Sequence, residues 1–203
     1  MIPARYLGLD LSLTGTGLCV LDAEGAVVAM ARVGSDLTRG VHERERIERL
    51  IVIAEAVLRV ARAAQAEGSL AVGVEDYAFS RRNGALVDLG ELGGVVKTQL
   101  WLALGVEPVR IPVSTARKSV LGRGNLPKVA VIPALAQRGY EFEDHNIADA
   151  YVIAEALRLH TRRCEHGEGA SEGSDGTGSG RGRRSAARRP AGRARQGGRQ
   201  RRG

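Results

Sequence analysis

Three carboxylates occupy positions at which acids can act together. Asp10 closes the hydrophobic run of "YLGLDLSLTGTGLCVLD", Glu75 closes that of "SLAVGVEDY", and Asp149 lies at the start of "NIADAYVIAEAL". Acids brought close together repel one another, so they stay ionised only with cations between them. Mg²⁺ and Mn²⁺ prefer such oxygen ligands, and two ions about 4 Å apart can activate water and stabilise the leaving oxygen in phosphodiester cleavage. The three acids together therefore suggest metal-dependent hydrolysis.

Each acid taken alone has a simpler explanation. Any of them can be a surface charge or a helix cap, and Asp149 is a favourable charge at a helix N-terminus. The metal-site hypothesis thus depends on structural elements that bring the three acids together.

The first half of the chain predicts strands around one long helix. Short β-rich segments at residues 5–12, 17–23 and 26–33 are separated by the turn-like "LTGT" and "EG", which predicts two successive antiparallel hairpins. A charged amphipathic helix follows over 41–66, and 69–77 is predicted to be a buried strand that ends in acids.

The second half predicts three helices and one strand. We expect helices over 85–104, 128–138 and 145–162, a strand over 107–113, and a basic loop, "STARKSVLGRGNLPK", after that strand. Pro127 suits a first helical position, while Pro133 should kink the helix that contains it.

This order of elements predicts an α/β fold, a mixed five-stranded sheet flanked by helices. If the first and fourth strands are parallel neighbours, Asp10 and Glu75 project from the same edge of the sheet. The last helix then needs only to pack across that edge to add Asp149.

Composition divides the chain near residue 160. Residues 161–203 hold 12 Arg against four acids, a net charge of +8, so residues 1–160 carry −1. We therefore predict a domain over 1–163 and a disordered Gly/Ser/Arg-rich tail over 164–203, which lacks the apolar residues that a core needs. The last 23 residues, from Arg181, are typical of an arm that binds polyanions, although a solubilising extension has the same composition.

The cysteines and the hydropathy indicate no further class of protein. Cys19 and Cys164 are far apart and have no metal-ligand spacing, so neither a disulfide framework nor a zinc site is expected. The sequence shows no signal peptide and no run of about 20 apolar residues. We expect a soluble cytoplasmic protein with no membrane partner and no nucleotide cofactor.

Five motifs resemble, in order, those of the RuvC-type Holliday-junction resolvases, the crossover junction endodeoxyribonucleases: "GLDLSLTGTGLCV", "GVEDYAF", "LGELGGVV", "RKSVLGRGNLPK" and "NIADAYVIAEAL". The resemblance covers about residues 5–160 and implies a ribonuclease H-like fold. It also implies a homodimer that resolves four-way DNA junctions by paired nicks, in the recombination and repair of bacterial or phage DNA. Each subunit would use two Mg²⁺ ions, with Mn²⁺ as a substitute, and Asp10, Glu75 and Asp149 correspond to the family's catalytic metal ligands.

One position departs from the family pattern. The family normally has a fourth metal-site residue, an acid or a His, three positions before the last Asp, where this chain has Asn146. Either Asn146 coordinates weakly, or Asp144 or His145 takes part in its place. Asn is also a preferred helix cap, so Asn146 can have that role alone.

Two basic segments are candidates for DNA contacts. In the resembled family an aromatic residue after the second acid stacks on a base, a role that falls to Phe79 or, failing that, Tyr77, with Arg81 and Arg82 near phosphates. Alternatively the aromatic residue belongs to the core and the two Arg are idle surface charges.

The second segment is the predicted loop after residue 113. By resemblance, Lys128 and, with a weaker match, Lys118 bind DNA near the cut, and Arg123 adds a third cation. Gly122 and Gly124 would permit close approach of the backbone to a phosphate.

Three rival functions remain at this stage. "SLTGTG" also resembles the first phosphate loop of actin-like ATPases, but those proteins need two such domains. RuvC-like ribonucleases of structured RNA share the fold, and Asn146 is a hint of a non-catalytic DNA-junction-binding protein.

Gly93 and Gly94 fit the close helix packing of a two-fold dimer, or else packing of the helix on its own sheet.

Overall fold

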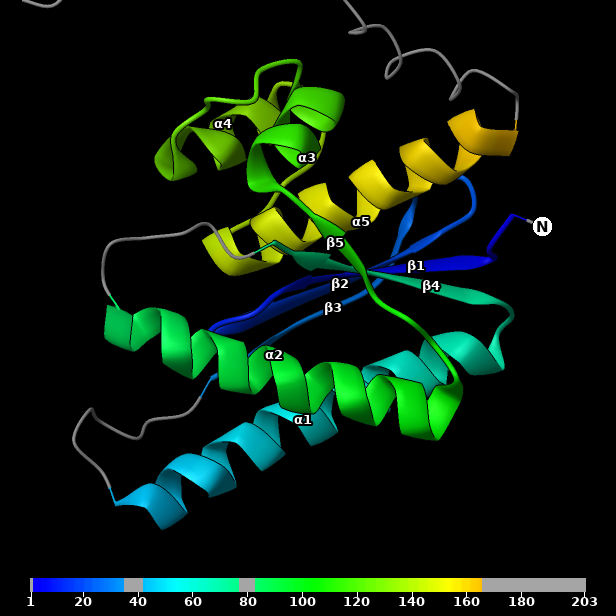
Figure 1. Cartoon of the computed structure of the whole chain (residues 1–203). Helices are drawn as coiled ribbons and strands as arrows, with labels where there is room; N and C mark the ends of the chain where they lie inside the picture. Colours follow the sequence, from blue (N-terminus) through cyan, green and yellow to red (C-terminus); the bar gives the residue numbers. More distant parts are fainter. Residues whose placement is uncertain (1, 35–41, 77–82, 166–203) are drawn as a thin grey trace, which may run out of the picture. The chain divides into compact units, whose positions relative to one another are not determined.

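The computed structural model describes residues 2–34, 42–76 and 83–165. It contains one mixed sheet with helices on both faces (Figure 1). The strands are β1 (Arg5–Asp10), β2 (Thr16–Asp22), β3 (Val27–Val33), β4 (Leu70–Glu75) and β5 (Val109–Ile111). They lie in the order β3-β2-β1-β4-β5. The predicted α/β, ribonuclease H-like five-stranded sheet is confirmed.

Strand pairing follows the prediction closely. β1 pairs antiparallel with β2, and β2 with β3, so both hairpins are confirmed. β1 and β4 are parallel neighbours in a register that sets Leu9 opposite Val74. The residues that follow these two, Asp10 and Glu75, therefore end adjacent strands at one edge of the sheet.

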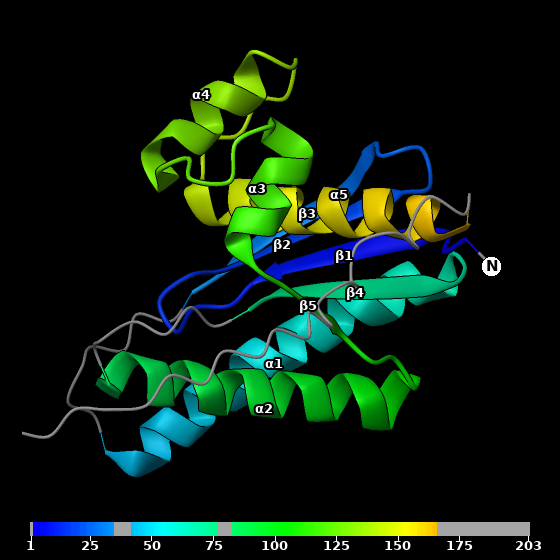
Figure 2. The same cartoon turned by 45° about the horizontal axis from the view of Figure 1, so that its top comes forward.

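Helices cover the two faces unequally. α1 (Glu43–Ala66) and α2 (Asn83–Leu104) lie on one face, and α5 (His145–Glu165) crosses the other, as Figures 1 and 2 show. α3 (Val113–Leu121), the 3₁₀ turn η1 (Lys128–Ala130) and α4 (Val131–Ala136) lie on the α5 side. Because α1 and α2 touch each other and α5 contacts β1, β2 and β4, the sheet is the middle of three layers.

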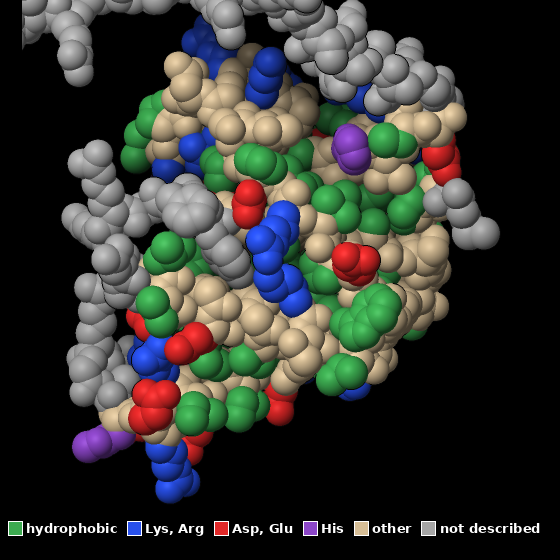
Figure 3. Space-filling view, viewed as in Figure 1, with side chains coloured by type: hydrophobic (Ala, Val, Ile, Leu, Met, Phe, Trp, Pro, Cys, Tyr) green, Lys and Arg blue, Asp and Glu red, His purple; other side chains and the backbone are tan. Residues whose placement is uncertain are grey.

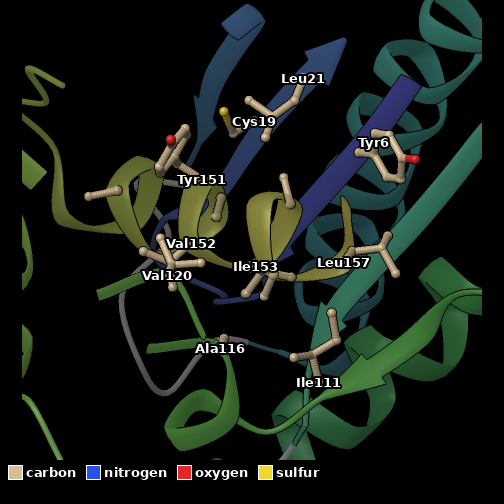
Figure 4. Close-up of a cluster of buried hydrophobic side chains, with 14 of the residues drawn as sticks. Tyr6, Cys19, Leu21, Ile111, Ala116, Val120, Tyr151, Val152, Ile153 and Leu157 are labelled. Atoms are coloured by element: carbon tan, nitrogen blue, oxygen red, sulfur yellow. The ribbon is translucent and has the colours of Figure 1, made fainter. Parts of the chain in front are cut away.

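Alternation along the strands divides the core in two. Leu7, Leu9 and Leu18 belong to the cluster under α1 and α2. The opposite cluster surrounds α5 and appears in Figure 4; it includes Tyr6, Cys19, Leu21, Val120, Tyr151, Ile153 and Leu157. Because successive side chains of a strand point to opposite faces of the sheet, each helix layer packs on its own apolar surface.

The predicted loop at 114–128 is wrong over its first part, which forms the nine-residue helix α3. Ala116, Val120 and Leu121 are buried at helical spacing and pack into the α5 cluster. Gly122 ends the helix with a φ of 79°, a left-handed conformation in which Gly has no Cβ penalty. The many basic and small residues hid this short apolar stripe from the sequence prediction.

The helix predicted over 128–138 is divided in two. Pro127 precedes the 3₁₀ turn η1, and the α-helix begins only at Val131. Pro133 is then the third residue of α4, a position at which a helix needs no backbone N–H, so the proline removes no hydrogen bond from α4.

The last helix continues through Glu165, beyond its predicted end at residue 162. The rest of the predicted tail lies outside the described residues. Within the described ranges, no helix is long and apolar enough to cross a membrane.

Candidate active site

Close packing of α5 on the sheet brings the third acid to the other two. A Cβ added to Gly8 of β1 would lie 2.0 Å from the carbonyl oxygen of Ala150, and one added to Gly17 of β2 would lie 2.0 Å from that of Asn146. Only Gly at these positions lets the first turns of α5 lie directly on the strands. Asp149, the fifth residue of α5, is thereby held over the end of β1.

The loop between β1 and β2 is closed by its own side chains. Thr16 is fully buried, and its hydroxyl donates to the Ser12 carbonyl (2.8 Å) and accepts from the Ser12 N–H (3.0 Å). These bonds satisfy the backbone of a tight turn beside Asp10.

Asp10 is the buried centre of the acid cluster. Its side chain is 9% exposed, and Oδ2 has no hydrogen-bond partner. Burial raises the pKa of Asp10, and a hydrogen bond and the negative charge from Glu75, with a further contribution from Asp149, raise it more, while Lys128 lowers it. The site thus concentrates negative charge that the protein only partly compensates.

Lys128 places a cation between two of these acids. Its Nζ lies 3.0 Å from Asn146 Oδ1, 3.2 Å from Asp149 Oδ2 and 3.6 Å from Asp10 Oδ2. Partial burial lowers the pKa of Lys128, but Asp10, Asp149 and Glu75 outweigh this effect and raise the pKa. The ammonium group is therefore held charged among oxygen atoms from β1 and α5.

Arg117 is a site residue that the sequence analysis did not select. Its Nη2 contacts Asp149 Oδ1 at 3.0 Å, and its Nη1 donates to the Leu126 carbonyl at 2.6 Å. Arg117 thus ties Asp149 to the segment that leads to Lys128. The signal that could have found it is the helical spacing of Ala116 and Val120 on either side, in a segment predicted to be a loop.

The other predicted DNA-binding residues are not part of this cluster. Lys118 and Arg123 are exposed, and neither makes an ion pair with the acids. The structure thus brings Arg117, and not its neighbour Lys118, to the acids. Phe79, Arg81 and Arg82, together with Tyr77, lie outside the described residues.

Asn146 faces the site and does not cap its own helix. Asp144 Oδ1 accepts the N–H groups of Asn146 (2.8 Å) and Ile147 (3.1 Å), so Asp144 is the cap. Asp144 Oδ2 also pairs with Arg32 at 3.3 Å. The hypothesis that Asn146 is only a helix cap is therefore wrong, because its side-chain oxygen accepts from Lys128.

The donor set fits a hard divalent cation in its chemistry. Asp10, Glu75, Asp149 and Asn146 each offer a side-chain oxygen as a ligand, and the buried Oδ2 of Asp10 accepts no hydrogen bond and faces a positive group, the Lys128 ammonium, at 3.6 Å. As the side chains stand, no three His, Cys, Asp or Glu residues of the described chain are arranged to hold a metal ion. The ammonium of Lys128 occupies the space between the oxygens instead.

A cavity of about 420 Å³ adjoins the cluster. It shares Arg117 with the acids and is also lined by Asp76, Ser114, Gly124 and Asn125. Its lining thus joins α3 to Asp76, the residue that directly follows Glu75 at the end of β4.

Comparison with solved structures identifies the fold. RuvC from Thermus thermophilus bound to a Holliday junction substrate matches with a TM-score of 0.66 and 23% identity, over 81% of this chain and 97% of RuvC. The chain has the RuvC fold. A second structure of Thermus thermophilus RuvC covers the same shares with a TM-score of 0.62 and 24% identity.

The resemblance seen in the sequence motifs is thus confirmed at the level of the RuvC fold. No protein-family model matches the sequence, and no curated protein matches it significantly. In the RuvC fold of this chain, the three predicted acids end or begin the elements β1, β4 and α5 at one edge of the sheet.

Proposed function

We propose that the chain is a Mg²⁺-dependent endonuclease that nicks four-way DNA junctions, with residues 1–163 as the nuclease domain. The observation that carries the proposal is the convergence of Asp10, Glu75 and Asp149, with one buried oxygen of Asp10 that accepts no hydrogen bond and lies 3.6 Å from the Lys128 ammonium. The RuvC fold supports it, since one matching structure is that of RuvC in complex with a Holliday junction substrate.

The roles of the residues follow from their positions. Asp10, Glu75 and Asp149 would hold the ions, and Asn146 would contribute a neutral oxygen. Bound Mg²⁺ or Mn²⁺ would supply an activated water and stabilise the leaving oxygen. Arg117 keeps Asp149 in position through the contact at 3.0 Å. The rigid strand ends and the closely packed α5 hold the acids in register for an incoming phosphodiester.

DNA would approach across α3 and the segment after it. Lys118 and Arg123 are exposed there and available to phosphates, and the neighbouring cavity gives a backbone access to the acids. Phe79, Arg81 and Arg82 would contact the opened junction from the segment that follows β4.

The exposed face of α2 is the best candidate for the interface of a homodimer. Val87, Gly90, Gly94 and Trp101 recur at helical spacing, and Val87 and Trp101 are 57% and 58% exposed. Among the described residues, and apart from the adjacent backbone of α2 itself, a Cβ on Gly90 or Gly94 would meet no atom within 4 Å, so neither Gly is needed for packing on the chain's own sheet. Figure 3 shows hydrophobic side chains on the surface over the end of α2, between acidic and basic ones. An apolar stripe with small residues and both charges suits a second copy related by a two-fold axis.

Sedimentation of Trp101→Lys tests this interface. We expect a dimer for the wild type and a monomer for the variant, because a lysine near the two-fold axis would be repelled by the same lysine of the second copy. Val27→Lys, on the exposed β3, is the matched control and should leave the dimer intact. If Trp101→Lys remains a dimer, the exposed face of α2 is not the dimer interface.

Cleavage of synthetic DNA tests the activity. A labelled four-way junction, a linear duplex and a branched control are incubated with and without Mg²⁺. We expect paired, symmetric nicks in the junction alone, which disappear in Asp10→Asn. The control is Glu67→Gln, the same carboxylate-to-amide change at an exposed position at the end of α1. Nicking that survives in Asp10→Asn would refute the proposed site.

A non-catalytic junction-binding protein is the second candidate. It is favoured by Asn146 at the fourth position and by the two cations that already pair with Asp149. Junction binding without Mg²⁺-dependent nicking in the same assay would select it. Cleavage of structured RNA, with junction DNA left intact, would select a ribonuclease.

A further inference from the structure

The Lys128 ammonium occupies the position in which a cation would contact the candidate ligands. Three oxygen atoms surround it, from Asn146 at 3.0 Å, Asp149 at 3.2 Å and Asp10 at 3.6 Å. These are the same oxygens that the proposed nuclease would offer to a divalent ion. A lysine in this place is therefore a rival of the metal as well as a possible contact for DNA.

Two cations cannot use this space at once. A hard ion needs oxygen ligands at about 2.0–2.5 Å and would lie well within repulsive distance of an ammonium that contacts the same atoms. The side chains of Asp10 and Asp149 are only 9% and 10% exposed, so water screens this repulsion poorly. Any ion that enters must first displace the lysine.

The Lys128 side chain can leave the acids more easily than that of Arg117, the other cation of the site. The side chain of Lys128 is half exposed, the residue belongs to the three-residue turn η1, and a lysine stem rotates freely. Arg117 is only 12% exposed and is fixed by two partners, the Asp149 carboxylate and the Leu126 carbonyl. Arg117 can therefore keep Asp149 in position after the ammonium has left.

We propose that Lys128 is a built-in competitor for the divalent cation, so that metal binding to the DNA-free chain requires its ammonium to leave the oxygens of Asp10, Asp149 and Asn146. The inference rests on the proposed function, because it assigns the metal to the same residues. The displaced ammonium is then free to take a DNA phosphate, which is the role that the sequence predicts for Lys128.

Titration of the full-length chain with Mn²⁺ in the absence of DNA tests the competition, with free Mn²⁺ followed by electron paramagnetic resonance. Lys128→Met removes the charge and keeps the length of the side chain. We expect it to bind Mn²⁺ at least about 5-fold more tightly than the wild type, at the lower end of typical coupling between two sites. Lys118→Met is the matched control, because it makes the same change on the exposed surface of α3, and its affinity should equal that of the wild type.

Further variants keep the test decisive. Lys128→Ala replaces Lys128→Met if the latter folds poorly by circular dichroism, and the same gain is expected. In the Asp10→Asn background the gain should shrink, because one of the contested oxygens is gone. Equal or weaker Mn²⁺ binding in Lys128→Met and Lys128→Ala would overturn the inference, and so would an equal gain in Lys118→Met. Since the readout is metal affinity, a chain that nicks junctions can still fail this test, and a chain that does not nick them can still pass it.

Discussion

Asp10→Asn should make the metal-free chain more stable, although it removes the central acid of the site. Asp10 is 6% exposed and lies within the field of Glu75 and Asp149, so its ionised form is costly. A pKa of about 8 in place of 3.8 corresponds to about 5 kcal/mol at pH 8. A buried amide with one unmet hydrogen bond loses about 1–3 kcal/mol of this gain. We therefore expect a net stabilisation of about 2–4 kcal/mol at pH 8.

The sign of the pH dependence follows from the same pKa. Below about pH 4 Asp10 is protonated in both the folded and the unfolded chain and has no effect. Between about pH 4 and pH 8 the unfolded chain releases the proton that the folded chain retains, so the stability of the wild type falls as pH rises. Asn has no such titration, and the gap between the two proteins should open across this range.

Thermal unfolding in EDTA, followed by circular dichroism at pH 4.5, 6 and 8, measures this gap. For a fold of this size, about 2–4 kcal/mol corresponds to about 4–16 °C in Tm at pH 8. At pH 4.5 the difference should be zero or negative, because the contribution of the Asp10 pKa falls to about 1 kcal/mol there while the cost of the amide remains. Excess Mg²⁺ should raise the Tm of the wild type more than that of Asp10→Asn. Glu67→Gln should show no pH-dependent gap. A Tm of Asp10→Asn equal to or below that of the wild type at pH 8, or a gap that does not change with pH, would refute the electrostatic reasoning.

Other predictions concern the support of the site. Arg117→Met should lower the free energy of unfolding by about 3 kcal/mol in a urea titration, since it leaves a buried carboxylate with one partner fewer. Gly17→Ala should cost more than about 3 kcal/mol or prevent folding, because its Cβ would meet the α5 backbone at 2.0 Å, whereas Gly94→Ala points into open space and should be neutral or stabilising by up to about 1 kcal/mol. A thiol reagent should label the exposed Cys164 at once and Cys19 only on unfolding, because burial raises the pKa of Cys19 to about 12; rapid labelling of two thiols in the native chain would contradict the packing of β2.

The sequence predicted best what depends on short-range pattern. Alternation and turn residues locate β1 to β4, and the acids Asp10 and Glu75 were correctly expected at one sheet edge because each closes an apolar strand. The packing of α5 across that edge also agrees with the prediction. Its cause, a helix laid directly on Gly8 and Gly17, was not inferred from the sequence, because nothing in a glycine's neighbours says which backbone will approach it.

The parts that sequence reasoning missed are those set by tertiary contacts. α3 is only nine residues long and has only three buried residues, so its amphipathic pattern repeats over far fewer turns than that of the 24-residue α1. With α3 read as a loop, the direction of Arg117 could not be inferred, and its neighbour Lys118 was selected instead. The sequence left the cap of α5 open for a similar reason: Asp144 and Asn146 are both good caps, and only the geometry of the first turn decides between them.

The two sides of the site differ in how firmly they are held, and this difference bears on mechanism. The acids stand on strand ends and on a helix that touches the sheet backbone, so their spacing cannot change without moving the core. The cations come from α3 and η1, two short elements outside the sheet, and they differ in exposure, because the Arg117 side chain is only 12% exposed and the Lys128 side chain is half exposed. Because the acids are held rigidly and the Lys128 ammonium can leave them, the proposed metal could bind without a change of fold. The same exchange would release Lys128 at the mouth of the site, where the proposed function would place the DNA backbone.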